Sequence, residues 1–182
     1  MIVVGIVAPG SPGGGGGAGG VVEIARRSAS AGVRSEIVGV VPAGPAGDRQ
    51  LLSLATAGVG HATVIRSAAS TIEAADLDLA LHYLPDVGAI VLVAPDAPLV
   101  AVAVAAAGWS GAALVVVGPV GADAIAVLDA ADGRPILLQP PARDPDGAFA
   151  GLVAALALRL NAGEDPGAAW RATVAALAID PA

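Results

Sequence analysis

The sequence predicts an α/β fold in which helices cover both faces of a mostly parallel sheet. Apolar runs of strand length alternate along the chain with longer segments of helical spacing. A glycine-rich stretch, residues 13–20, separates the first apolar run from the first helical segment, as in many ligand-binding loops. We therefore expect one three-layer αβα domain spanning residues 1–182, doubly wound, with ligands bound beyond the carboxyl ends of the strands.

Three strand–helix units are predicted in the first half of the chain. Gly58 suits the C-cap of the second helix. Ser70-Thr71-Ile72-Glu73 has the spacing of a capping box and predicts the start of the third helix. The strands are expected at residues 2–7, 36–41 and 62–66, and the helices at residues 21–31, 47–57 and 70–83.

The second half continues the alternation. Apolar strands are predicted at residues 89–93 and 113–117, on either side of a helix at 98–107. The segment 125–138 fits either a hairpin with its turn at Asp132-Gly133 or a short helix followed by a strand. A long helix is expected at 145–161, and Asp165-Pro166 has the N-cap and first-position proline of a last helix.

The composition excludes several function classes. All nine basic residues are arginines, so lysine chemistry and a Walker-type phosphate lysine are absent. Without cysteine the chain has no disulfide framework, thiolate nucleophile or cysteine metal site. The net charge of −7 opposes binding to nucleic acid or anionic lipid.

Neither a targeting signal nor a membrane span is predicted. No basic residue precedes the first apolar run, so it makes a poor signal peptide. The uncharged stretch between Asp96 and Asp123 is long enough to cross a bilayer, but Pro98, Pro119 and the break at residues 108–111 favour a helix, a turn and a strand. A cytoplasmic location is expected.

The glycine-rich stretch also allows a dinucleotide-binding interpretation. Gly15, Gly17 and Gly20 satisfy the G-x-G-x-x-G spacing, although so many glycines satisfy many spacings. The second predicted strand runs into Val41-Pro42-Ala43 and carries no acidic residue at its end to bind a ribose. This interpretation is kept as an alternative.

Four segments, in one order, resemble the ribokinase-like (PfkB) carbohydrate kinases. Residues 19–32 resemble the family's glycine-glycine…Asn-x-Ala…Leu-Gly signature, and 38–47 (VGVVPAGPAG) its V-G-x-V-G-D-D-x-x-G motif. Residues 115–125 (VVVGPVGADAI) are similar to its nucleotide segment, and 140–158 to its D-T-x-G-A-G-D-A-F helix start. The resemblance implies a truncated, ribokinase-like αβα domain without the substrate lid.

The departures from the family fall on the chemistry. The catalytic aspartate that the resemblance implies is replaced by Gly147, which cannot accept a proton. The anion hole implied at the same turn aligns with Asp144, Pro145 and Asp146; Pro145 lacks an N–H, and two carboxylates are expected to face an incoming polyphosphate.

Other functional positions of the family are also changed. Its sugar-binding Asn aligns with Glu23, its acidic pair with Pro42-Ala43-Gly44 and its nucleotide-contacting Thr with Pro119. No N-x-x-E magnesium motif occurs at residues 94–98.

The resemblance thus implies candidate sites beside simpler structural interpretations. Gly19, Gly20 and Glu23 would bind substrate, and Gly121, Asp123, Asp144 and Gly147 a nucleotide or anion; Asp146, one residue from the aligned base, is the candidate catalytic residue. The simpler interpretations make Asp144 an N-cap, Asp146 a first-turn acid, Asp123 a turn former and Glu23 a solvated helix residue. His61 and His82 are interpreted as structural, and no metal site is expected.

Three hypotheses follow. The first is a degenerate ribokinase-like protein that binds a small ligand or a partner. The second is an active sugar or nucleoside kinase that uses Asp146 with ATP and Mg²⁺. The third is an assembly protein, because a shortened sheet exposes edges and apolar faces that homo-oligomers cover. We favour the first, with self-association as a companion.

Overall fold

The structure, a computed structural model, describes residues 1–5, 18–68, 72–142, 144 and 146–177. Its six strands form one parallel sheet in the order β3-β2-β1-β4-β5-β6. The strands are β1 (Ile2–Gly5), β2 (Ser35–Pro42), β3 (Gly60–Ser67), β4 (Ala89–Val93), β5 (Ala113–Val117) and β6 (Ile136–Leu138).

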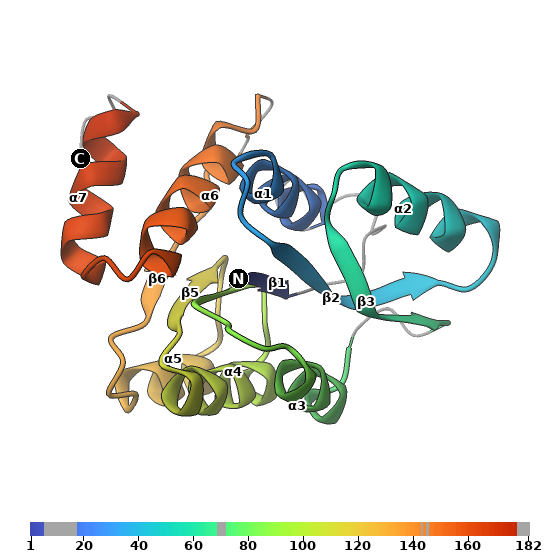
Figure 1. Cartoon of the computed structure of the whole chain (residues 1–182). Helices are drawn as coiled ribbons and strands as arrows, with labels where there is room; N and C mark the ends of the chain where they lie inside the picture. Colours follow the sequence, from blue (N-terminus) through green and yellow to red (C-terminus); the bar gives the residue numbers. More distant parts are fainter. Residues whose placement is uncertain (6–17, 69–71, 143, 145, 178–182) are drawn as a thin grey trace.

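Helices cover both faces of this sheet. In Figure 1, α1, α2, α6 and α7 lie above the strands, and α3, α4 and α5 lie below them. The helices are α1 (Ala18–Ser30), α2 (Pro45–Thr56), α3 (Ala74–Tyr83), α4 (Ala97–Ser110), α5 (Ala122–Asp129), α6 (Ala148–Asn161) and α7 (Pro166–Ala176). The predicted three-layer, doubly wound α/β architecture is confirmed.

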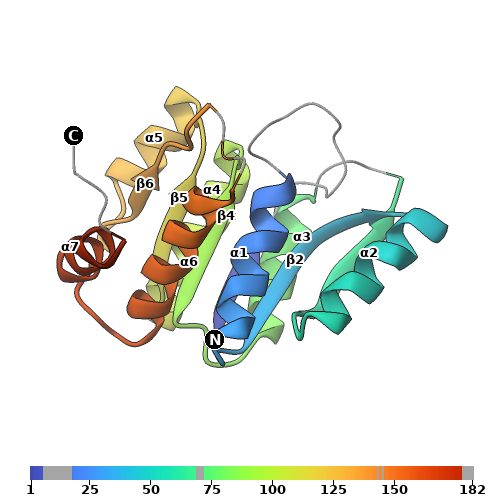
Figure 2. The ribbon, with the colours of Figure 1, turned by 90° about the horizontal axis from the view of Figure 1, so that it is seen from above.

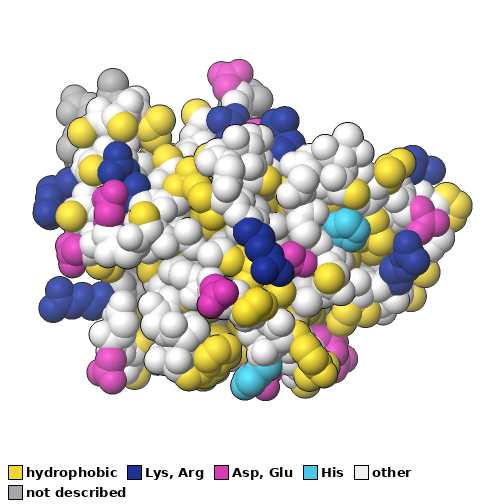
Figure 3. All heavy atoms as spheres, viewed as in Figure 1, with side chains coloured by type: hydrophobic (Ala, Val, Ile, Leu, Met, Phe, Trp, Pro, Cys, Tyr) yellow, Lys and Arg dark blue, Asp and Glu magenta, His cyan; other side chains and the backbone are white. Residues whose placement is uncertain are grey.

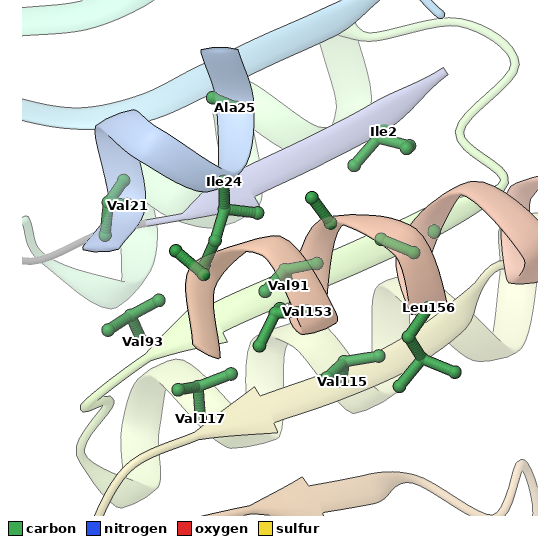
Figure 4. Packing of buried hydrophobic residues seen from close by; sticks show 14 of the residues in the cluster. Ile2, Val21, Ile24, Ala25, Val91, Val93, Val115, Val117, Val153 and Leu156 are labelled. Atoms are coloured by element: carbon green, nitrogen blue, oxygen red, sulfur yellow. The ribbon is translucent and has the colours of Figure 1, made fainter. Parts of the chain in front are cut away.

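Alternation along the central strands supplies both halves of the core. In β4, Val91 and Val93 belong to the cluster beneath α1 and α6, whereas Ile90 and Leu92 belong to the cluster on the other face. Figure 4 shows the first cluster, in which Ile24 of α1 and other apolar side chains meet the strands. Burial on both faces explains why these strands are continuous apolar runs.

Most of the predicted helices and strands are confirmed, and two strands begin and end at the predicted residues. The strands at 89–93 and 113–117 have the predicted bounds. Segment 125–138 is the short helix α5 followed by β6, not a hairpin. Asp165 caps α7 by accepting from the backbone N–H of Ala168 at 3.0 Å. No helix among the described residues is both long and apolar enough to cross a bilayer.

The predicted start of the third helix is wrong. α3 begins at Ala74, and Glu73 takes the N-cap position without a side-chain capping bond. Ser70 and Thr71 lie outside the described residues, as do residues 6–17 with their glycine run. Ile72 is only 4% exposed and belongs to the core cluster that contains α3. Its burial ahead of the helix overrides the local capping pattern.

A buried carboxylate marks the pairing of β2 with β3. Glu36 is 4% exposed, and its Oε1 accepts from the backbone N–H of Ala62 at 2.9 Å. The register shifts at this point, so the carboxylate takes the place of a ladder acceptor. A Cβ on Gly60 would collide with the Glu36 carboxylate, which explains the glycine at the start of β3.

Candidate functional site

Two segments far apart in the sequence, the middle and last turn of α1 and the start of α6, lie together in the fold. α1 lies between α6 and α2, as Figure 2 shows from above. A Cβ on Gly147 would lie 3.3 Å from Nη2 of Arg27 and 3.8 Å from Cγ of Glu23. The structure therefore brings together Glu23 and Gly147, which align with the sugar-binding Asn and the catalytic base of the family that the sequence resembles.

The turn before α6 is held by a carboxylate of its own. Asp144 accepts from the N–H of Phe149 at 3.1 Å and from the N–H of Ala150 at 3.3 Å, one bond to each carboxylate oxygen. Gly147 has φ +65°, a left-handed conformation that glycine adopts readily and that allows Asp144 to reach over the helix start. The N-cap position belongs to Gly147, so the interpretation of Asp144 as the N-cap is wrong in position, although its carboxylate does bond the first N–H groups of α6.

This geometry corrects two expectations. The Asp144 carboxylate faces the helix N–H groups, so only Asp146 of the pair remains exposed without a described partner. Asp146 is also not a first-turn acid, because α6 begins at Ala148. The two carboxylates therefore do not both face an incoming polyphosphate. The N–H groups at the start of α6 that would hold an anion are instead bonded to the carboxylate of Asp144.

Glu23 is the centre of a charged cluster on α1. It pairs with Arg26 and with Arg27, each at 2.7 Å. Burial opposes ionisation of Glu23, but the hydrogen bonds from the two guanidinium groups outweigh it and lower the pKa of Glu23. Glu23 is therefore ionised at neutral pH, and its charge is balanced by the guanidinium groups of Arg26 and Arg27.

Arg27 is the site residue that the sequence analysis missed. Its Nη1 would lie 3.1 Å from a Cβ on Gly151, and its Nη2 lies near Gly147, so the guanidinium covers the first turn of α6. The spacing of Glu23 and Arg27, four residues apart on a helix, is a local signal for their ion pair. The contact with α6 is long-range and has no such signal.

The other candidate positions lie at the same edge of the sheet but apart from this turn. Gly19 and Gly20 are in the first turn of α1. Gly121 is the N-cap of α5 and Asp123 its exposed second residue, on the layer opposite α6. A Cβ on Gly121 would have no described atom within 4 Å, whereas one on Gly147 would meet Arg27 and Glu23.

An ion pair lies near the carboxyl ends of β2 and β3. Asp48, in the first turn of α2, pairs with Arg66 of β3 at 2.8 Å, and both side chains are more than half exposed. An acid is thus present near the end of β2, although the strand itself ends in Pro42.

The histidines have local backbone partners. Nδ1 of His61 lies 3.1 Å from the carbonyl oxygen of Val59, and Nδ1 of His82 lies 2.8 Å from that of Asp78. Within the described ranges, no group of three or more His, Asp or Glu side chains could hold a metal ion.

The comparisons with known proteins concern the fold. No family model matches the sequence, and no curated protein matches it. Among solved structures, Sa239 is 12% identical with a TM-score of 0.64, over 100% of this chain and 94% of that one. Phosphofructokinase-2 from Escherichia coli, in complex with potassium, is 14% identical with a TM-score of 0.61, over 97% and 91%.

A third similar structure is aminoimidazole riboside kinase from Salmonella enterica, complexed with aminoimidazole riboside and an ATP analog. It is 12% identical with a TM-score of 0.58, over 97% of this chain and 90% of that one. At such identities the likeness shows the fold alone. The chain has a ribokinase-like fold in a reduced version with few strands.

Proposed function

We propose that this protein is a carbohydrate-kinase homologue that has lost efficient phosphotransfer and binds a small ligand or a protein partner. One observation carries the proposal. The N–H groups of Phe149 and Ala150, at the helix start where the family resemblance implies an anion hole, are bonded to the carboxylate of Asp144. A phosphoryl group would have to displace that carboxylate. The helix dipole also stabilises the carboxylate in its place.

The absent base supports the same conclusion. Gly147 stands beside Glu23 and Arg27, where the resemblance implies an aspartate that takes a proton from the substrate hydroxyl. Glu23 is near, but its two arginine partners lower its pKa and make it a poor proton acceptor. The residues around this turn therefore do not fit ATP and Mg²⁺ as a phosphoryl donor.

What remains at the turn is a binding surface with both kinds of polar group. Glu23 presents carboxylate oxygens, and Arg26 and Arg27 present guanidinium donors at the same place. Such groups recognise hydroxyl, amine or carboxylate groups on a ligand. We therefore expect a polar small molecule, or a polar segment of a partner, to bind against α1 and the start of α6.

Isothermal titration calorimetry tests the proposal. Titration of the protein with ATP–Mg²⁺ should show no tight binding, and phosphotransfer to a panel of sugars should stay at background. Glu23→Gln should weaken binding of any sugar or polyol that does bind, whereas Arg171→Glu on α7 serves as a control at an exposed site elsewhere. Tight ATP–Mg²⁺ binding by the unmodified protein would refute the proposal.

An active kinase that uses Asp146 is a second candidate. Asp146 is exposed and has no described partner, so its carboxylate is accessible to a substrate hydroxyl. In that case Asp146→Asn would abolish a measurable turnover that Asp132→Asn, at an exposed aspartate outside the candidate site, leaves intact. Turnover that survives Asp146→Asn would exclude this candidate.

Dinucleotide binding is the third candidate, and the strand order favours it. The order β3-β2-β1-β4-β5-β6, all parallel, is that of dinucleotide-binding α/β folds. Asp48 also places a carboxylate near the end of β2, although it is paired with Arg66. Quenching or enhancement of NADH fluorescence on binding, lost in Asp48→Asn, would support this candidate over the first.

A further inference from the structure

A basic groove and an acidic face lie on opposite helical layers of the molecule. The basic groove, of about 730 Å³, lies between α1 and α2; Arg26, Arg49 and Leu52 line it together with hydroxyl side chains. The acidic face, with a hollow of about 590 Å³, lies on α3 and is lined by Asp76, Asp78, Leu79, His82 and Tyr83. α2 lies above the sheet and α3 below it in Figure 1.

Among the described residues, the lining of the basic groove holds two arginines and no carboxylate. No acidic residue stands three or four positions from Arg49 on α2, and Arg49 forms no ion pair with a described residue. Arg26 pairs with Glu23, but that single carboxylate is shared with Arg27. The groove therefore attracts acidic side chains.

The acidic face is the counterpart of this groove. No cationic residue stands three or four positions from Asp76 on α3, and Asp76 forms no ion pair with a described residue. Asp78 lies 3.5 Å from Nδ1 of His82, which carries charge only when it is protonated. No arginine lines this face, so its carboxylates are available to an external guanidinium.

Both surfaces expose large hydrophobic side chains. Tyr83 is 76% exposed, Leu52 67% and Leu79 57%, the highest values among the large hydrophobics of the described residues. Trp109, 53% exposed, extends the acidic face, since its ring lies 5.1 Å from that of His82. Figure 3 shows hydrophobic, acidic and histidine side chains together at the lower edge, over α3. Exposed aromatic side chains of this kind are enriched at protein interfaces.

We infer that the acidic face of one copy of this chain docks into the basic groove of a second copy. Arg49 would meet Asp76 and Asp78, while Tyr83 and Leu79 would cover Leu52. Because the two surfaces lie on opposite layers, one molecule cannot join its own pair. The contact is therefore head to tail and stacks copies along the direction perpendicular to the sheet.

Charge reversal with rescue tests the inference, with sedimentation velocity on the full chain up to high micromolar concentration. The unmodified protein should associate, and added salt should weaken the association. Arg49→Glu and Asp76→Arg should each raise the dissociation constant about tenfold, because each turns an attractive pair into a repulsive one. Arg171→Glu and Asp132→Arg, matched reversals at exposed sites elsewhere, should leave it unchanged.

The rescue separates a lost contact from a damaged fold. The double variant R49E/D76R should associate again, since its groove and its face are both reversed. An equimolar mixture of the two single variants should also associate, because each groove then finds a face of opposite charge. Thermal unfolding of every variant checks that it is folded.

Three results would overturn the inference. They are a monomer at every concentration, association that neither charge reversal changes, and association lost in Ala62→Lys but in neither charge variant. The last result would place the contact at the edge strand β3, where Ala62 is exposed. Arg26 lines the groove and also pairs with Glu23, but none of these variants alters Arg26, Glu23, Arg27 or the start of α6, so the outcomes do not depend on the proposed function.

Discussion

Replacing Asp144 by alanine removes the carboxylate that caps α6 and frees two helix donors. The lost cap costs about 0.5–2 kcal/mol. The lost charge at the helix N-terminus costs about 0.3–1 kcal/mol more. We therefore expect Asp144→Ala to lower the free energy of unfolding by about 1–3 kcal/mol, which for a chain of this size lowers Tm by several degrees.

The same variant should bind anions that the unmodified protein does not. With the N–H groups of Phe149 and Ala150 free, phosphate can take the place of the carboxylate. At about ten times its Kd, phosphate would return about 1.4 kcal/mol of stability. Calorimetric or urea unfolding of Asp144→Ala, with and without phosphate at constant ionic strength, measures both effects.

Asp146→Ala is the matched control, because Asp146 is an exposed carboxylate two residues away in the same turn. It should change stability by less than about 0.5 kcal/mol and gain no phosphate dependence. If Asp144→Ala were as stable as Asp146→Ala, Asp144 would not be holding the α6 donors. An anion hole blocked by Asp144 would then be excluded.

Three further predictions concern the cluster on α1, the β2–β3 pairing and the core. The pKa of Glu23 is lowered, so its contribution to stability is fully present above its unfolded pKa and is lost as pH falls through its folded pKa. In urea unfolding between neutral and acidic pH, the free energy of unfolding of Glu23→Gln should therefore fall less than that of the unmodified protein. Gly60→Ala forces a Cβ against the buried Glu36 carboxylate and should cost about 1–3 kcal/mol in the same assay, and wild-type stability would contradict the close approach. Ile24→Ala, at a residue 1% exposed, should cost about 2–5 kcal/mol, whereas Leu52→Ala, at a residue 67% exposed, should cost less than about 0.5 kcal/mol; equal losses would show that Ile24 is not part of the core.

The parts of the fold that the sequence predicts well are those fixed by local patterns. The strands at residues 89–93 and 113–117 are uninterrupted apolar runs, and this pattern is what burial on both faces requires. Asp165-Pro166 predicts the start of α7 because capping depends on neighbouring residues only. Segment 125–138 stayed ambiguous because its strand, β6, is only three residues long.

The candidate site is less predictable because its contacts join distant segments. Asp144 reaches N–H groups five and six residues ahead, beyond the usual spacing of a cap, and it does so through a left-handed residue at Gly147. Arg27 covers Gly147 and Gly151 only because α1 and α6 pack side by side. Neither arrangement leaves a periodic signal in the sequence.

The geometry of α1 shows how such a site can change while the fold persists. Val21, Ile24 and Ala25 are buried against the sheet, whereas Glu23 and Arg27 point to the α6 turn. Since the helical period separates the two faces, substitutions on the second leave the core contacts intact. The Asp144 carboxylate stabilises the helix start by bonding the N–H groups of Phe149 and Ala150. On the proposed function, these are the groups that an external anion would need. Likeness of fold therefore carries little information about activity here, and the state of the α6 donors carries most of it.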